Sequence, residues 1–226
     1  MRYGVLISFA GLLCSASAHA AVLSAESIDP SRLLPPPPMA GSPIAVAEVA
    51  ELKAIAMRST PEMVAQATHD AKDETPDIFN AALGFDIAMK PATFKLLNMV
   101  VEEEEAASKR AKAYFHRDRP WIVDATIATC TPKPLGPAAT SYPSGHSTLA
   151  FSMGVVLASL VPEKAQDILK RSRQYAEHRL VCGVHFRSDI TAGQQFGTVL
   201  ALRMMEDGKF RAQMDAAKDE LQKAKQ

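Results

Sequence analysis

The chain has 226 residues, 47% of them hydrophobic, with 25 Lys and Arg against 25 Asp and Glu. This length and composition predict one sizeable core, in one domain or at most two, and nothing marks the chain as disordered. A formal net charge of zero provides no general basic field, so the sequence does not favour binding of a nucleic-acid polymer or of an anionic membrane surface. Any anion site must be built locally.

The first 20 residues have the pattern of a secretory signal peptide. Arg2 supplies a positive start, Val5 to Cys14 form a short apolar run, and Ala18-His19-Ala20 is a small-x-small cleavage site. The apolar run is too short to span a bilayer as a stable anchor. We therefore expect residues 1–20 to be removed and the mature chain to be periplasmic or secreted.

Residues 21–43 are expected to form an extended, proline-rich lead, because they lack periodicity and contain Pro35-Pro36-Pro37-Pro38. Helical periodicity begins at residue 44, and no repeat and no series of alternating strands follows. We assign residues 44–226 to a single all-α domain, a helical bundle whose functional site lies in loops and at helix ends.

Several helices are expected in this domain, and their starts are marked by prolines and by Ser or Thr caps, as in Thr60-Pro61-Glu62. The expected ranges are 44–57, 61–70, 76–84, 91–116, 147–160, 162–177, 190–205 and 207–225. Residues 120–143 carry five prolines, so no helix is expected there. Long ordered loops of this kind are often functional.

Acidic residues on these helices are expected to be solvated. Glu48 falls on the polar face of the 44–57 helix. The run Glu102 to Glu105 lies in the longest predicted helix, where consecutive positions point in four directions and cannot converge on one cation.

Three clusters of polar residues flank non-helical segments and together offer cations, histidines, a hydroxyl and a carboxylate. They are Lys112 and Arg119 at the end of the longest predicted helix, Ser144, Gly145 and His146 in the turn Ser141-Tyr142-Pro143-Ser144-Gly145-His146, and Arg179, His185 and Asp189 further on. In the turn, proline fixes the backbone and glycine permits an approach that a Cβ would block. Taken alone, the turn fits an ordinary loop as well as an anion cradle.

Together, the clusters resemble the signature of the type 2 phosphatidic acid phosphatase superfamily, which includes the vanadium haloperoxidases. The pattern reads Lys-x6-Arg-Pro, then Pro-Ser-Gly-His, then Arg-x5-His-x3-Asp. Within the superfamily, the signal peptide, the lead Leu33-Leu34-Pro35-Pro36-Pro37-Pro38 and the Ser141-Tyr142 prefix are similar to bacterial class A non-specific acid phosphatases. The resemblance covers essentially the whole mature chain.

The resemblance implies an exported acid phosphatase that hydrolyses phosphate monoesters of broad range through a phosphohistidine. It implies that His185 is the nucleophile, that Asp189 holds the proton on the other ring nitrogen, and that His146 is the general acid and then the general base. The implied phosphate-binding residues are Lys112, Arg119, Ser144, Gly145 and Arg179.

No cofactor and no metal ion is expected. The chain has no His-x-x-x-His or Cys-x-x-Cys spacing, and the cations at the site would repel a metal while neutralising phosphate themselves. The expected partners are small-molecule phosphate monoesters, and the sequence leaves open a homo-oligomer.

Two residues next to motif residues do not follow the signature. His178 stands where the signature usually has serine before Arg179, so His178 either replaces that serine's hydroxyl in the phosphate pocket or alters the pocket. Arg117, like its neighbour His116, matches no fixed motif position, and both are expected to be surface residues.

Removal of residues 1–20 would leave two cysteines, Cys130 and Cys182, in a compartment that permits disulfides. Export favours one Cys130–Cys182 bridge over two buried free thiols. The bridge would tie the proline-rich loop to the segment that carries Arg179 and His185.

Other functions fit parts of the pattern. A vanadium-dependent haloperoxidase uses similar ligands for vanadate, although this chain is short for that group. A non-catalytic exported phosphate-binding module would use the three cations but has little use for His185 beside Asp189. A membrane lipid phosphatase shares the motifs, but the mature chain has no apolar stretch of about 20 residues.

Overall fold

The computed structural model describes residues 22–133 and 140–223. All regular secondary structure in these two ranges is helical. No strand occurs among the described residues, where the β-type pairing is an isolated bridge between Asp118 and Thr140. The predicted all-α class is confirmed. The predicted signal peptide, residues 1–20, lies outside the described ranges.

The helices follow the expected order closely. They are α1 (Pro30–Leu33), α2 (Pro43–Arg58), α3 (Pro61–Asp70), η1 (Pro76–Phe79), α4 (Asn80–Leu83), η2 (Ile87–Met89), α5 (Pro91–Phe115), α6 (Pro120–Val123), α7 (Gly145–Leu160), η4 (Pro162–Lys164), α8 (Ala165–Val181), α9 (Arg187–Glu206) and α10 (Gly208–Lys223). Prolines occupy the first turn of α2 and α3, and the side chains of Ser42 and Thr60 cap these helices by accepting from Ala45 N and Met63 N.

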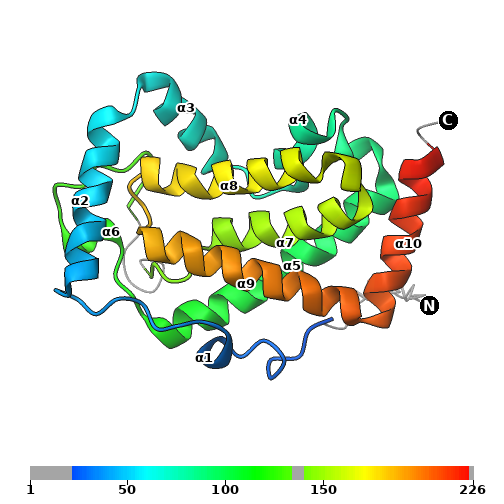
Figure 1. Ribbon diagram of the computed structural model, residues 1–226, viewed down its shortest axis with the longest axis horizontal. Coiled ribbons are helices and arrows are strands. Elements are labelled where there is room, and N and C mark those ends of the chain that lie inside the picture. Colours follow the sequence, from blue (N-terminus) through cyan, green and yellow to red (C-terminus); the bar gives the residue numbers. More distant parts are fainter. Residues whose placement is uncertain (1–21, 134–139, 224–226) are drawn as a thin grey trace, which may run out of the picture.

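Helix α7 is the centre of the bundle. It lies between α8 and α9 and also packs on α5 (Figure 1). Its apolar residues face several neighbours at once, and Leu149, Met153 and Leu157 are all buried in the main core. Helix α9 approaches α7 closely at Gly193, where a Cβ would lie 2.6 Å from the Ser144 carbonyl oxygen. The start of α7 is therefore held by its packing against α9.

The ends of the bundle are closed by other helices. Helix α10 packs on α5 and α9 at one end, and α2 stands across the other end and contacts α8 (Figure 1).

Residues 22–43 of the proline-rich lead also pack on the bundle. Leu23, Ile28 and Leu34 are buried in the main core, and Pro35 O accepts a hydrogen bond from the Tyr142 hydroxyl at 2.6 Å. The lead is thereby tied to the turn that carries the second motif.

The proline-rich connection contains a helix that the sequence analysis did not expect. In α6 (Pro120–Val123), Pro120 takes the first helical position, where its missing N–H costs nothing, and Trp121 is buried. The expectation that residues 120–143 contain no helix is wrong for this single turn. It places Arg119, the residue before α6, at a fixed point of the fold.

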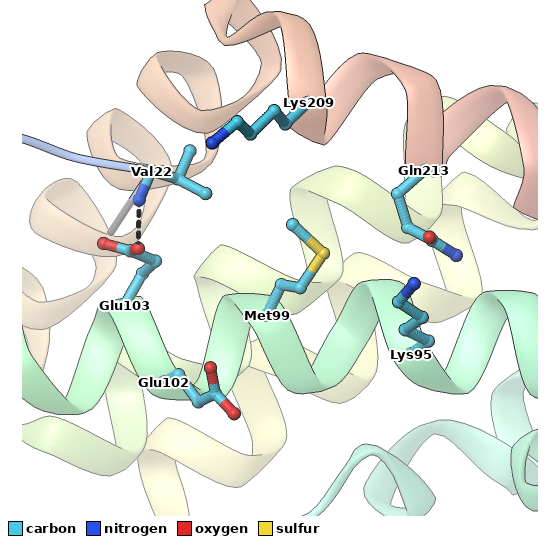
Figure 2. Close-up of a pocket in the computed structure, with 7 residues that line it drawn as sticks. All are labelled: Val22, Lys95, Met99, Glu102, Glu103, Lys209 and Gln213. Carbon is cyan, nitrogen blue, oxygen red and sulfur yellow. Dashed lines mark hydrogen bonds between the residues drawn. The ribbon is translucent and has the colours of Figure 1, made fainter. Parts of the chain in front are cut away.

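The glutamate run is not a uniformly solvated face. Glu102 and Glu105 are exposed, but Glu103 and Glu104 are only 9% and 5% exposed. Glu103 accepts hydrogen bonds from the backbone amides of Val22 at 2.5 Å and Leu23 at 3.3 Å, and Figure 2 shows it reaching toward Val22 beside a pocket that Glu102 also lines. Glu103 thus anchors the beginning of the lead.

Within the described ranges, no helix combines the length and the apolar composition that crossing a bilayer requires.

Candidate active site

The three predicted clusters meet around the N-terminus of α7. From the first cluster, Lys112 lies in the last turn of α5 and Arg119 precedes α6. From the second, Ser144 caps α7, and Gly145 and His146 are its first two residues. From the third, Arg179 lies in the last turn of α8, His185 in the loop that follows, and Asp189 in the first turn of α9. Residues far apart in the chain are therefore brought to one end of the bundle.

His185 is 1% exposed, and both of its ring nitrogens have neighbours. Nε2 lies 2.8 Å from Arg119 Nη1, and Nδ1 lies 3.4 Å from Asp189 Oδ2. A guanidinium can only donate, so Nε2 accepts and the ring proton sits on Nδ1, facing Asp189. The free electron pair of His185 therefore points toward the cations.

Burial and the positive charges of Arg119, Lys112 and Arg179 hold the pKa of His185 well below its usual range. The ring therefore stays neutral at mildly acidic pH, as a nucleophile requires.

Asp189 is buried and accepts hydrogen bonds on both oxygens. Arg117 Nη1 donates to Oδ1 at 2.6 Å, while Ser141 Oγ donates to Oδ2 at 2.5 Å and the Phe186 amide at 2.8 Å. Burial raises the pKa of Asp189, and the Arg117 charge and the other donors oppose this shift. Hydrogen bonds to both oxygens are the pattern of an ionised carboxylate, which can hold the Nδ1 proton of His185.

Arg117 was expected on the surface, and that expectation is wrong. Its side chain is 9% exposed and bridges two carboxylates, with Nη2 donating to Glu48 Oε2 at 2.7 Å as well as Nη1 to Asp189. Glu48, expected on a solvated face of α2, is buried and also accepts from the Ser188 amide at 2.6 Å. His116, by contrast, is exposed as expected.

The three motif cations surround the space that His185 Nε2 faces. Lys112 Nζ donates to Pro143 O at 2.7 Å, and burial together with the Arg119 charge lowers the pKa of Lys112 to about 7. Arg179 is 5% exposed, and its Nε and Nη1, like Arg119 Nε, are buried with no protein partner in the described part of the chain. Buried guanidinium N–H groups need acceptors, and the oxygens of an anion such as phosphate supply them.

The turn of the second motif is fixed to the third. The Tyr142–Pro143 peptide bond is cis. Ser144 N donates to Asp189 O at 3.0 Å, and Ser144 Oγ accepts from Ser147 N at 3.4 Å as the cap of α7. The positive end of the α7 dipole therefore lies next to the cations, an arrangement that favours an anion.

His146 lies beside the cations but is bonded to a segment that the sequence analysis did not single out. Its Nδ1 is 2.8 Å from Glu74 Oε1, its Nε2 is 3.3 Å from Ala71 O, and its ring stacks on Tyr175. Burial and the Arg179 charge lower the pKa of His146, and the Glu74 carboxylate opposes them. Both nitrogens are occupied, so proton transfer from His146 requires one contact to open.

His178 is paired with Asp70 and not with the motif cations. Its Nδ1 lies 2.7 Å from Asp70 Oδ2, and both oxygens of Asp70 also accept from Arg171 at 2.8 Å. The departure from the usual serine thus ties α8 to the end of α3, directly before the segment that contacts His146.

A disulfide fixes the loop before His185. Cys130 and Cys182 are bonded, and Cys130 N donates to Cys182 O at 3.2 Å. Gly183 follows with a φ of +64°, and a Cβ there would lie 2.2 Å from Ala128 O. The bridge and this glycine together set the path of the chain into His185.

Among the described residues, no group of three or more His, Cys, Asp or Glu side chains is placed to hold a metal ion. The residues that the sequence analysis missed are Arg117, Glu48, Glu74 and Ser141. Only Arg117 and Ser141 carry a sequence signal, since they lie inside or beside the motifs.

The chain is similar in sequence to proteins of a known family. The family model described as PAP2 superfamily matches residues 92–212, which contain all three motifs. The chain is 33% identical to an acid phosphatase of Zymomonas mobilis over 98% of this chain and 88% of the relative. It is 32% identical to a non-specific acid phosphatase of Providencia stuartii over 89% and 84%, and 30% identical to one of Salmonella typhimurium over 87% and 81%.

The fold is also similar to a solved structure, a transmembrane PAP2 type phosphatidylglycerolphosphate phosphatase from Bacillus subtilis. The TM-score is 0.56 at 18% identity, over 74% of this chain and 87% of the other.

Proposed function

The chain belongs to the PAP2 superfamily and is a phosphatase, and from this premise we propose that it hydrolyses phosphate monoesters of broad range through a phosphohistidine on His185. The observation that carries the proposal is the state of His185: a buried neutral ring whose unprotonated Nε2 faces three cations and whose Nδ1 faces Asp189.

In the first step, the phosphoryl group binds among Lys112, Arg119 and Arg179, with Ser144 and Gly145 contributing hydrogen bonds. His185 Nε2 attacks phosphorus as the bond to the leaving oxygen breaks, and the ring becomes positively charged. Asp189 stabilises that charge through Nδ1–H. His146 gives its proton to the leaving oxygen, so the product leaves as a neutral alcohol.

In the second step, His146 has lost its proton and acts as a base. It takes a proton from a water molecule, whose oxygen attacks phosphorus as the bond to Nε2 breaks. The products are inorganic phosphate, neutral His185 and reprotonated His146, which restores the starting state.

We propose that the reaction proceeds without a metal ion. Three cationic side chains converge on the phosphoryl position and supply the charge neutralisation that metal ions provide in other phosphatases. A divalent cation placed among them would be repelled.

The substrate class and the pH range of the proposal follow from the names of the relatives. They are named acid phosphatases, two of them non-specific, so small-molecule monoesters are the proposed substrates and mildly acidic pH the proposed range. Export, with removal of residues 1–20 and a mature chain of lead and helical domain, is proposed from the amino-terminal sequence.

Hydrolysis of p-nitrophenyl phosphate across pH, with and without a chelator, tests the proposal. We expect multiple turnovers at mildly acidic pH, unchanged by the chelator, and loss of turnover in His185→Ala. Binding of phosphate without product release would instead favour a phosphate-binding module, and halide oxidation after addition of vanadate would favour a haloperoxidase.

A further inference from the structure

A cavity of about 200 Å³ adjoins the phosphate-binding residues on one side. Its wall includes Lys112 and Gly145, together with Glu74, Glu104 and Glu105 and the apolar Leu149. Because two residues of the proposed phosphate site line it, a group attached to the bound phosphoryl can extend into it.

The cavity lies on the side of His146. Neither histidine lines the cavity, but two of its wall residues adjoin His146: Gly145 precedes it in the chain, and Glu74 contacts its ring. In an in-line displacement the leaving oxygen is opposite the nucleophile, next to the group that protonates it. The alcohol part of the substrate therefore occupies this cavity.

Glu104 is a buried residue of the cavity wall. It is 5% exposed, and its Oε1 accepts from Ser108 Oγ and lies 3.9 Å from the position that a Cβ on Gly145 would take. Burial raises the pKa of Glu104 to about 8, so it is an uncharged carboxylic acid at acidic and neutral pH. Such a group both donates to and accepts from a hydroxyl.

The other charged groups of the cavity wall are already paired. Lys109 Nζ binds Glu105 Oε1 at 2.6 Å, and Glu74 Oε1 lies 2.8 Å from His146 Nδ1. Lys112 binds the phosphoryl group in the proposed mechanism. An anionic substituent on the alcohol would thus enter beside Glu104 and Glu74 with no free cation on the described wall to receive it.

We propose that Glu104 is a specificity residue of this cavity, which favours phosphate monoesters of polyols and sugars over esters whose alcohol carries a carboxylate or a second phosphate. The proposal rests on the proposed function and predicts which phosphate monoesters are preferred within its broad substrate range. Glu104 hydrogen-bonds a hydroxyl of the leaving alcohol, whereas an anionic group in its place meets no uncommitted cation on the described wall.

A matched pair of substrates tests this, glycerol 3-phosphate and 3-phosphoglycerate, which differ in a hydroxymethyl or a carboxylate on the same carbon skeleton. The readout is the ratio of their kcat/KM values, which does not depend on how much of a preparation is folded. We expect the wild-type ratio to favour glycerol 3-phosphate by on the order of tenfold, which is the effect expected from one lost hydrogen bond.

Two variants of Glu104 and one control complete the experiment. Glu104→Leu removes the hydrogen bond and should lower the ratio by about five- to tenfold, while Glu104→Gln retains a donor and an acceptor and should keep most of it. Glu102→Leu is the control, because Glu102 is exposed on the same helix but lines the separate pocket of Figure 2. Its ratio should equal that of the wild type.

The outcomes separate this inference from the proposed function. A wild-type ratio near one, or a ratio in Glu104→Leu equal to that of the control, would overturn the inference while hydrolysis of both esters left the proposed function standing. Failure to hydrolyse either ester or p-nitrophenyl phosphate would overturn the function itself.

Discussion

The reactivity of each histidine in the site depends on what holds its two ring nitrogens. His185 has a cation on one side and a carboxylate on the other, which favours a neutral ring with Nε2 unprotonated. His146 has a carboxylate and a carbonyl oxygen, which oppose the lowering of its pKa by burial and by Arg179. The neighbours of the two rings therefore act in opposite directions, as the proposed nucleophile and the proposed acid require.

Arg117, which donates a hydrogen bond to Asp189, gives a first prediction. The Arg117 charge lowers the pKa of Asp189, so in Arg117→Met burial is opposed only by the hydrogen bonds from Ser141 and Phe186, and the pKa of Asp189 rises. Because the ionised carboxylate is needed, the acid limb of the kcat profile should move to higher pH, and kcat should fall by on the order of 10- to 100-fold, as for outer partners of other functional histidines. Arg117→Lys should recover part of the loss. An unchanged acid limb would show that Arg117 is only structural.

Lys112 gives a second prediction, because its pKa is lowered to about 7. A lysine with a lowered pKa is charged below that pH and loses its charge above it, so its contribution to phosphate binding should fade as pH rises through 7. Arginine keeps its charge over this range.

The measurement is the inhibition constant of inorganic phosphate, which requires no proton transfer by His146. The ratio of the wild-type constant to that of Lys112→Arg should rise by about tenfold between pH 6 and pH 8. A ratio that does not change with pH would contradict the titration of Lys112 in this range.

Sequence reasoning brought the motif residues together but missed their supports, for a physical reason. Motif spacing marks the residues to which the resemblance assigns phosphate binding and proton transfer. Arg117 and Glu48 lie behind Asp189, and their positions depend on the packing of α2 against the site. Glu104 was interpreted as solvated because a run of four glutamates on a helix usually is. Only the approach of α7 to α5 encloses it.

Among the helices, sequence signals worked best where they are local. Proline at the first turn and a Thr cap predicted the start of α3, and the expected 61–70 helix is the observed one. Periodicity alone predicted a start at residue 44 for α2, which begins one residue earlier at Pro43, after the Ser42 cap. The single turn of α6 was missed because four residues are too few to show periodicity, and its burial through Trp121 is a tertiary effect.

The junction between α3 and α8 gives a third prediction. Asp70 binds Arg171 through both oxygens and also His178, so Asp70→Asn leaves buried donors poorly paired and should lower the free energy of unfolding by about 3 kcal/mol. Urea unfolding measures this. Asp215→Asn on the exposed face of α10 is the matched control and should stay within about 0.5 kcal/mol of the wild type.

The pH dependence of this difference has a definite sign. The pKa of Asp70 is held below its ordinary value by Arg171 and His178 despite its burial. Its stabilisation is present above the unfolded pKa and is lost as pH falls through the folded pKa. The difference between wild type and Asp70→Asn should therefore persist at pH 5 and shrink below about pH 4. A difference that does not shrink between pH 4 and pH 2 would contradict the ion pair.

For the whole molecule, the disulfide is the main covalent constraint in the described chain. It closes a sequence separation of 52 residues, and a loop of that size contributes about 4 kcal/mol in the chain-entropy model. Removing both cysteines with Cys130→Ser and Cys182→Ser should lower stability by up to this amount in thermal or urea unfolding. A reductant should destabilise the wild type but not the double variant, and equal stability of the two proteins would show that the bridge is dispensable.

The most direct test of the account is to trap the phosphorylated enzyme. Wild-type protein is mixed rapidly with a radiolabelled phosphate monoester and quenched in alkaline denaturant, because phosphohistidine is labile to acid, and the labelled peptide is identified by mass spectrometry. We predict transient label on His185, longer-lived label in His146→Ala because hydrolysis loses its base, and none in His185→Ala. Steady turnover by His185→Ala, or product release by the wild type with no label on His185 at any time, would contradict the mechanism.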